Sequence, residues 1–154
     1  MRPGTIRSQG GATISEMAPA LFILVIFALL PVIDLIVDGL GYCACLTLNN
    51  LQLREAARVP KSQATDPKGS VQLAIPNNWR NSAFGGLAPL MDDPQTSVTY
   101  DIVAHSAFVS VTTTLSVRPM IPVPFFNSTP GLGAPMVFTV GSEKVLENPG
   151  FLNY

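Results

Sequence analysis

Hydrophobic and polar positions divide the chain into a short polar start, a long apolar run and a region of alternating apolar and polar residues. No charged side chain lies between Met17 and Ile33, and the apolar character continues to Val37. A bilayer core of about 30 Å requires about 20 helical residues. The pattern therefore predicts a membrane-crossing helix over about residues 17–37.

Beyond this run the pattern becomes that of an amphipathic helix. The members of one apolar stripe recur at intervals of three, four and seven residues: Leu40, Cys43, Leu46, Leu53 and Ala57. Pro60 is expected to end the helix. We therefore predict one helix over residues 12–59, about 70 Å long, with its first half in lipid and its second half outside.

The residues before the apolar run are basic, which predicts the orientation of the helix. Arg2 and Arg7 lie in residues 1–11 without any acid. This bias predicts a cytoplasmic N-terminus with the rest translocated. A cleaved signal peptide would have an apolar region of about 7–15 residues followed by a small-x-small site. The longer run here, continued by a helical pattern, favours retention in the membrane.

Residues 60–154 are expected to form a Pro/Gly-rich, loop and β-sheet domain outside the membrane. The stretch from Pro60 to Gln95 is expected to be loop-rich. In SAFVSVTTTLSVRP, Val109, Val111, Leu115 and Val117 share one strand face. SVTYDIV and APMVFTVG are further strand candidates, and SEKVLEN is a weak fourth. We predict an α+β fold, in which a small antiparallel sheet packs against the outer half of the helix.

Composition narrows the function classes. Hydrophobic residues make up 47% of the chain and charged residues 12%, about half the share of roughly 25% in soluble domains. The net charge is −1 without a basic patch, so nucleic acid is not an expected partner. We see no nucleophile–base pair, metal cluster or phosphate loop, and expect neither an enzyme nor a cofactor. His105, the only histidine, is interpreted as a strand residue.

The most informative string is Gln9-Gly10-Gly11-Ala12-Thr13-Ile14-Ser15-Glu16-Met17. A glycine ends the basic leader, and a glutamate follows five residues later at the mouth of the apolar run. Glycine lets a backbone enter a narrow protease site in extended form. A carboxylate carried to the bilayer centre costs about 2.5–3.5 kcal/mol and therefore calls for a partner. Glu16 could instead be an interfacial acid at a helix N-terminus, where the helix dipole favours it.

These residues resemble the prepilin motif of TadE-like minor pilins of bacterial tight-adherence pili. The resemblance extends to Arg7-Ser8-Gln9-Gly10-Gly11-Ala12, to Pro31 within the apolar run and to Leu53-Arg54-Glu55-Ala56-Ala57-Arg58. Met17 stands where Phe or Tyr is usual, Pro19 comes early, and Asp34 and Asp38 interrupt the outer part of the run. The match is good over about fifty residues and general over the remainder.

The resemblance implies a function and its partners. A prepilin peptidase would cut between Gly11 and Ala12, and Glu16, then the fifth residue, would pair with the free amine of a neighbouring subunit. The chain would be a minor pilin or pseudopilin, first in the inner membrane and then in the periplasm or an extracellular pilus. Its partners would be other pilin subunits and the assembly machinery. The alternative is a single-pass anchored extracytoplasmic binding domain that never polymerises.

Asp34 and Asp38 are four residues apart and share one helical face. They either meet water or lipid headgroups beyond the end of the membrane, or form polar contacts between pilin subunits. Pro31 is expected to kink the helix or open a turn. A straight helix through Asp34 would count against a break at Pro31.

Cys43 and Cys45 point about 200° apart on a helix and cannot bridge one another comfortably. They are either small packing residues near the membrane surface or the source of an intermolecular disulfide in an oxidising compartment. A lone C-x-C falls short of the four ligands of a zinc site.

Overall fold

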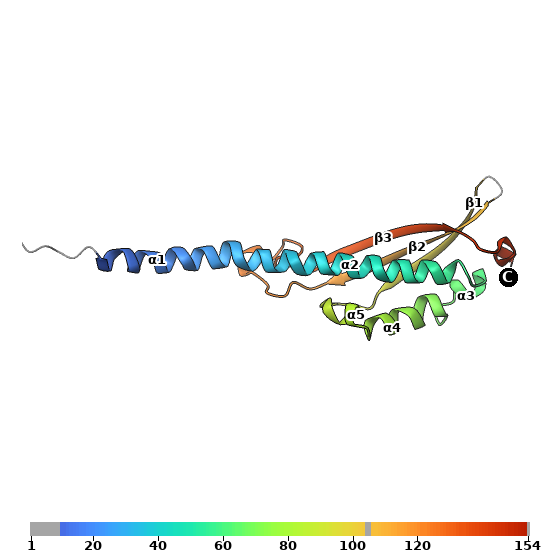
Figure 1. The fold of residues 1–154 in the computed structure, drawn as a ribbon, viewed down its shortest axis with the longest axis horizontal. Helices are drawn as coiled ribbons and strands as arrows, with labels where there is room; N and C mark the ends of the chain where they lie inside the picture. Colours follow the sequence, from blue (N-terminus) through green and yellow to red (C-terminus); the bar gives the residue numbers. More distant parts are fainter. Residues whose placement is uncertain (1–9, 104–105, 154) are drawn as a thin grey trace, which may run out of the picture.

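The computed structural model describes the backbone of residues 10–103 and 106–153, and the chain forms an elongated rod (Figure 1). One long helix extends the length of the rod, and the remaining elements lie along its C-terminal half (Figure 1). The predicted combination of a long N-terminal apolar helix with a small antiparallel sheet is confirmed. Residues 1–9 of the predicted leader and His105 lie outside the described residues.

The long helix is built from three consecutive segments: α1 (Gly10–Leu24), the π-helical turn η1 (Val25–Leu29) and α2 (Leu30–Ala56). The Leu30 N–H donates to Val25 O, five residues back. Pro31 has no N–H, and its ring would clash with the carbonyl of Phe27 in a regular α-helix. The wider π turn directly before Pro31 relieves this clash. The helix therefore continues through Pro31 with one opened turn rather than a break (Figure 1).

The same arrangement recurs after the long helix. The π-helical turn η2 (Ser70–Ala74) ends two residues before Pro76, as η1 ends two residues before Pro31. Each proline therefore enters the first turn of the following α-helical segment, where its ring is tolerated.

Three antiparallel strands form the sheet in the order β1 (Gln95–Val103), β2 (Ser106–Val117) and β3 (Met136–Val145). The alternation predicted for β2 is confirmed, since Val109, Val111, Leu115 and Val117 are all buried. β3 continues through Gly141, opposite Thr112, so the first residues of the weak fourth candidate, SEKVLEN, belong to β3. A fourth strand there was a wrong expectation, because Gly141 keeps its place in the ladder instead of ending it.

Two clusters of buried apolar residues lie between α2 and the strands. Leu53 and Ala56 group with Val109 and Val111 near the distal end, together with Val71. Ala44, Cys45 and Leu48 group with Leu115 and Val140 nearer the apolar half, together with Trp79. Each cluster therefore combines residues of the helix, the sheet and the segment between them.

The buried face of α2 differs from the predicted stripe. Leu40 and Cys43 are exposed, whereas Gly41 and Ala44 are buried. A Cβ on Gly41 would lie 2.9 Å from Val117 Cγ2 and 3.1 Å from Phe138 Cε2. Small residues occupy this face at Gly41 and Ala44, where the strands approach the helix closely, whereas Leu48 and Leu53 supply large buried side chains further along it.

The segment expected to be loop-rich contains short helices. Besides η2 these are α3 (Lys61–Ala64), α4 (Ile75–Arg80) and α5 (Ala83–Leu87), which lie beside α2 (Figure 1). Ser82 caps α5 through its hydroxyl, which accepts from Gly85 N. Such short helices are unstable alone. Here Val71 of η2 and Trp79 of α4 are buried in the clusters that α2 shares with the sheet.

Candidate functional site

The predicted processing site lies at the start of the long helix. Gly11 and Ala12 fall in the first turn of α1, which begins at Gly10, and Glu16 lies about 7.5 Å beyond Gly11 along the same helix. The side chains of residues 10–16 lie outside the described part. Peptidase cleavage between Gly11 and Ala12 requires this first turn to unwind, and helix ends fray readily.

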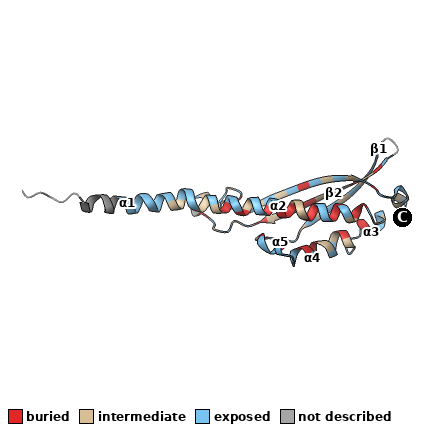
Figure 2. Cartoon of the chain, viewed as in Figure 1, coloured by how far each residue is buried: buried red, intermediate tan, exposed pale blue. Residues whose placement is uncertain are grey.

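The apolar half of the helix, Met17–Ile33, presents large hydrophobic side chains to its surroundings. Figure 2 shows this half almost entirely exposed, whereas buried residues concentrate along the C-terminal half of α2. The exposed members include Met17, Leu21, Phe22, Ile23, Leu24, Phe27, Leu29 and Val32. Within the described residues, this is the one helix long and apolar enough to cross a membrane.

Asp34 is fully buried within the chain. Its Oδ1 accepts hydrogen bonds from Met120 N at 2.9 Å and from Ile121 N at 3.0 Å. Both donors belong to the β2–β3 loop, residues 118–135, which returns along the helix. Asp34 Oδ2 has no partner among the described residues. The structure therefore gives Asp34 an intramolecular partner, and its contact with another subunit remains a prediction.

Asp38 lies one turn further along the helix, against the same loop. Gly131 has a φ of +80°, and a Cβ at this position would collide with Asp38 Oδ2. Asp38 Oδ1 is buried without a partner among the described residues. The two acids, predicted to share one helical face, thus both face the β2–β3 loop, and their spacing alone did not predict this contact.

The β2–β3 loop also contacts the apolar half of the helix. The ring of Phe125 stacks on that of Phe27, with centroids 5.6 Å apart and planes 20° apart. Phe125 nevertheless remains 70% exposed and Met120 66% exposed. The loop carries no charged residue between Arg118 and Glu143. The Pro/Gly-rich composition predicted loops in this region but not their contact with the apolar helix.

The two cysteines have different environments. Cys43 is exposed, whereas Cys45 is fully buried and donates to Thr113 O at 3.5 Å. Burial raises the pKa of the Cys45 thiol to about 11. Cys43 is therefore accessible for an intermolecular disulfide. The prediction that Cys45 could also form one is wrong, because its thiol is buried.

A buried polar network links α2 to all three strands. Asn49 Nδ2 lies 2.8 Å from Val111 O, 3.1 Å from Val140 O and 3.1 Å from Thr113 Oγ1. Gln52 Nε2 donates to Thr96 Oγ1 at 2.7 Å and to Val71 O at 2.9 Å, and Thr113 Oγ1 donates to Gln52 Oε1 at 2.7 Å. Asn49 and Gln52 are polar, yet both are fully buried.

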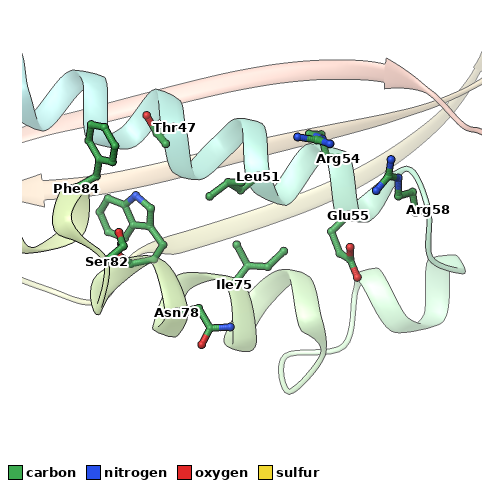
Figure 3. Close-up of a pocket in the computed structure, with 10 residues that line it drawn as sticks. Thr47, Leu51, Arg54, Glu55, Arg58, Ile75, Asn78, Ser82 and Phe84 are labelled. Atoms are coloured by element: carbon green, nitrogen blue, oxygen red, sulfur yellow. The ribbon is translucent and has the colours of Figure 1, made fainter.

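An open groove of about 500 Å³ lies between α2 and the short helices α4 and α5 (Figure 3). Leu51, Ile75 and Phe84 supply apolar walls, while Arg54 and Arg58 lie at one end (Figure 3). Trp79 Nε1 is buried without a partner among the described residues. The groove could hold a small apolar segment, but it brings together no nucleophile and base.

The described residues contain no candidate metal site. Across residues 10–103 and 106–153, no group of three or more His, Cys, Asp and Glu residues could hold a metal ion. Asp93 pairs with Arg80 at the surface. Compared with protein-family models, curated proteins and solved structures, the chain gives no match in any of the three. Its function therefore has to be argued from its own residues.

Proposed function

We propose that this chain is a minor pilin or pseudopilin subunit of a bacterial tight-adherence pilus. It is anchored by the helix Gly10–Ala56 and carries a helix-and-sheet head on the outer half of that helix. The feature that carries the proposal is the Gly11–Ala12 junction with Glu16 five residues after Gly11, at the start of an exposed apolar helix.

The shape of the chain supports this assignment. A filament of such subunits needs an apolar helix that can leave the lipid and pack against its neighbours, with a head displayed at the surface. Large apolar side chains of Met17–Ile33 are mostly exposed among the described residues, and Phe125 stacks on Phe27. In a bilayer lipid would cover them, and in a filament other subunits would do so.

The role of Glu16 follows from the cost of its charge. A carboxylate within the apolar environment is stabilised only by a partner of opposite charge or by hydrogen-bond donors. Cleavage after Gly11 would create a free amine at Ala12, which is the partner available in a neighbouring subunit. This pairing would fix the axial register of a subunit as it enters the filament.

The first test is the mature N-terminus of the chain purified from sheared filaments. N-terminal sequencing is expected to begin at Ala12, and Gly11→Leu is expected to block processing. Filament-associated chain that still begins at Met1 would contradict the proposal.

The second test is the substitution Glu16→Ala. Loss of the carboxylate is expected to reduce incorporation into surface filaments while the processed chain still accumulates in the membrane, as measured by immunoblotting of both fractions. Glu55→Ala removes a carboxylate from the outer part of the same helix and serves as the matched control. Equal incorporation of both variants would remove the role proposed for Glu16.

A non-polymerising anchored binding domain is the second candidate, and the groove beside Trp79 favours it. An unpartnered indole N–H between apolar walls would suit a ligand that offers one acceptor. Absence of the chain from sheared filaments, with retention in the membrane, would favour this candidate.

A further inference from the structure

The β2–β3 loop is long and follows the helix rather than the sheet. It joins Val117 to Met136 and contains the short 3-10 turn η3 (Pro124–Phe126). Instead of folding back over the head, it returns along the helix and places Phe125 on Phe27. Phe27 belongs to the apolar half of the helix, so the loop extends to the part of the chain proposed to lie in lipid.

The depth of Phe27 follows from the length of a membrane span. A span of about 20 residues contains Phe27 whether it begins at Gly10 and ends near Leu29 or begins at Met17 and ends near Ile36. Because Phe125 stacks on Phe27, it lies at the same depth. From these contacts we infer that the β2–β3 loop is a second membrane contact, inserted into the outer leaflet beside the helix.

Charge and exposure agree with a lipid environment. From Pro119 to Ser142 the chain contains no Asp, Glu, Lys or Arg. Met120 and Phe125 are the large exposed apolar side chains of the loop, 66% and 70% exposed. Arg118, at the start of the loop, is exposed and can reach lipid phosphates from the interface.

Most backbone N–H groups of the loop are satisfied within the protein, whereas those of Phe125, Asn127 and Ser128 have no partner among the described residues. Irregular backbone in hydrocarbon is costly unless its polar groups are satisfied within the protein. Five loop residues are prolines and have no N–H: Pro119, Pro122, Pro124, Pro130 and Pro135. The N–H groups of Val123, Phe126, Thr129, Gly131, Leu132, Gly133 and Ala134 donate to carbonyls of the loop itself.

Asp34 completes this arrangement. It accepts the N–H groups of Met120 and Ile121, so the carboxylate and two loop donors satisfy one another. Its complete burial means that the loop screens this acid from lipid. The span can therefore extend past Ile33 on the side that the loop covers, while Leu35 and Ile36 remain exposed on the other.

The inference rests on the proposed membrane crossing, and the experiment separates the two. The full chain is reconstituted into vesicles of phosphatidylglycerol and phosphatidylcholine, with or without bromine on the phosphatidylcholine acyl chains, and tryptophan fluorescence is measured. The wild-type chain supplies the baseline, because its single tryptophan, Trp79, is buried beside α2 in the head. Phe125→Trp reports on the loop, and Met120→Trp is a second reporter should the first fail to fold.

Two control variants frame the result. Phe22→Trp, on the exposed apolar half of the helix, reports on the crossing, and Phe151→Trp, in η4 (Pro149–Asn153) at the distal end, reports on the outside. We expect brominated lipid to quench Phe125→Trp about as strongly as Phe22→Trp and to leave Phe151→Trp at the wild-type level.

Three results would overturn the inference. Quenching of Phe22→Trp without quenching of the loop reporters would leave the crossing intact and remove the loop from the membrane. Absence of quenching in Phe22→Trp as well would remove the crossing and the loop contact together. The loop reporter could also show a blue-shifted emission maximum without quenching, with a shift that grows with the protein-to-lipid ratio. This result would show that the loop contacts a neighbouring copy of the chain instead of lipid.

Discussion

Gly131 is the residue at which the β2–β3 loop meets Asp38 of the long helix. Its φ of +80° disfavours L-residues with a Cβ, and the added atom would also collide with Asp38 Oδ2. We expect Gly131→Ala to lower the free energy of unfolding by about 1–3 kcal/mol. Urea unfolding of the full chain in detergent micelles, followed by Trp79 fluorescence, measures this change.

Gly39 provides the matched control for this substitution. It lies in α2, and a Cβ there would meet no atom within 4 Å. Gly39→Ala is therefore expected to raise stability by up to about 1 kcal/mol through helix propensity alone. Equal effects of the two substitutions would show that the loop does not hold Gly131 against Asp38.

Asp34 and Asp38 illustrate what the sequence could and could not establish about single residues. Their spacing placed both acids on one helical face, and the structure has both facing the β2–β3 loop. Nothing in the pattern indicated that backbone N–H groups from 86 and 87 residues away would meet Asp34. Such contacts depend on the path of a loop, which local sequence does not determine.

Asn49 joins the long helix to two strands, since its Nδ2 lies within hydrogen-bond distance of Val111 O and Val140 O. Removing the amide would leave these buried carbonyls and Thr113 Oγ1 without their donor. Because an unsatisfied buried polar group costs about 1–3 kcal/mol, Asn49→Ala is expected to lower the free energy of unfolding by about this amount. The same urea titration measures it.

The neighbouring Asn50 offers a control with the same change of side chain. Asn50 is exposed on α2, so Asn50→Ala is expected to leave stability unchanged or to raise it by a few tenths of a kcal/mol. A destabilisation of Asn50→Ala as large as that of Asn49→Ala would contradict the role assigned to the buried amide.

The strands and the long helix could be predicted because their patterns are regular over many residues. β2 alternates strictly, and its predicted face is the buried one. The predicted stripe of α2 is buried at Leu53 and Ala57 but exposed at Leu40 and Cys43, because Gly41 and Asn49 of the buried face carry no hydrophobic signal. The helices α3–α5 were missed because each has only four to six residues and depends on packing against α2.

The molecule as a whole separates two environments along one axis. Apart from the contact of Phe27 with Phe125, the described residues leave the apolar half of the helix largely exposed, whereas the C-terminal half is covered by the sheet on one side and the short helices on another (Figure 2). Cover begins at the opened turn η1, which contains Phe27, and is complete at Asp34. This division is what an anchored subunit needs, since lipid or neighbouring helices must replace the missing cover.

The proposed orientation predicts which side of the membrane exposes Cys43. Arg2 and Arg7 should keep the N-terminus cytoplasmic, so Cys43, beyond the apolar half, should face the periplasm. A membrane-impermeant maleimide should therefore label the chain in intact spheroplasts, and Cys43→Ser should abolish the signal. Cys45 should not contribute, because it is fully buried and its pKa, raised to about 11, keeps it a thiol near neutral pH. Labelling that appears only after lysis would show the opposite orientation. Replacing Arg2 and Arg7 by Glu is expected to increase the fraction of chain that is labelled only after lysis.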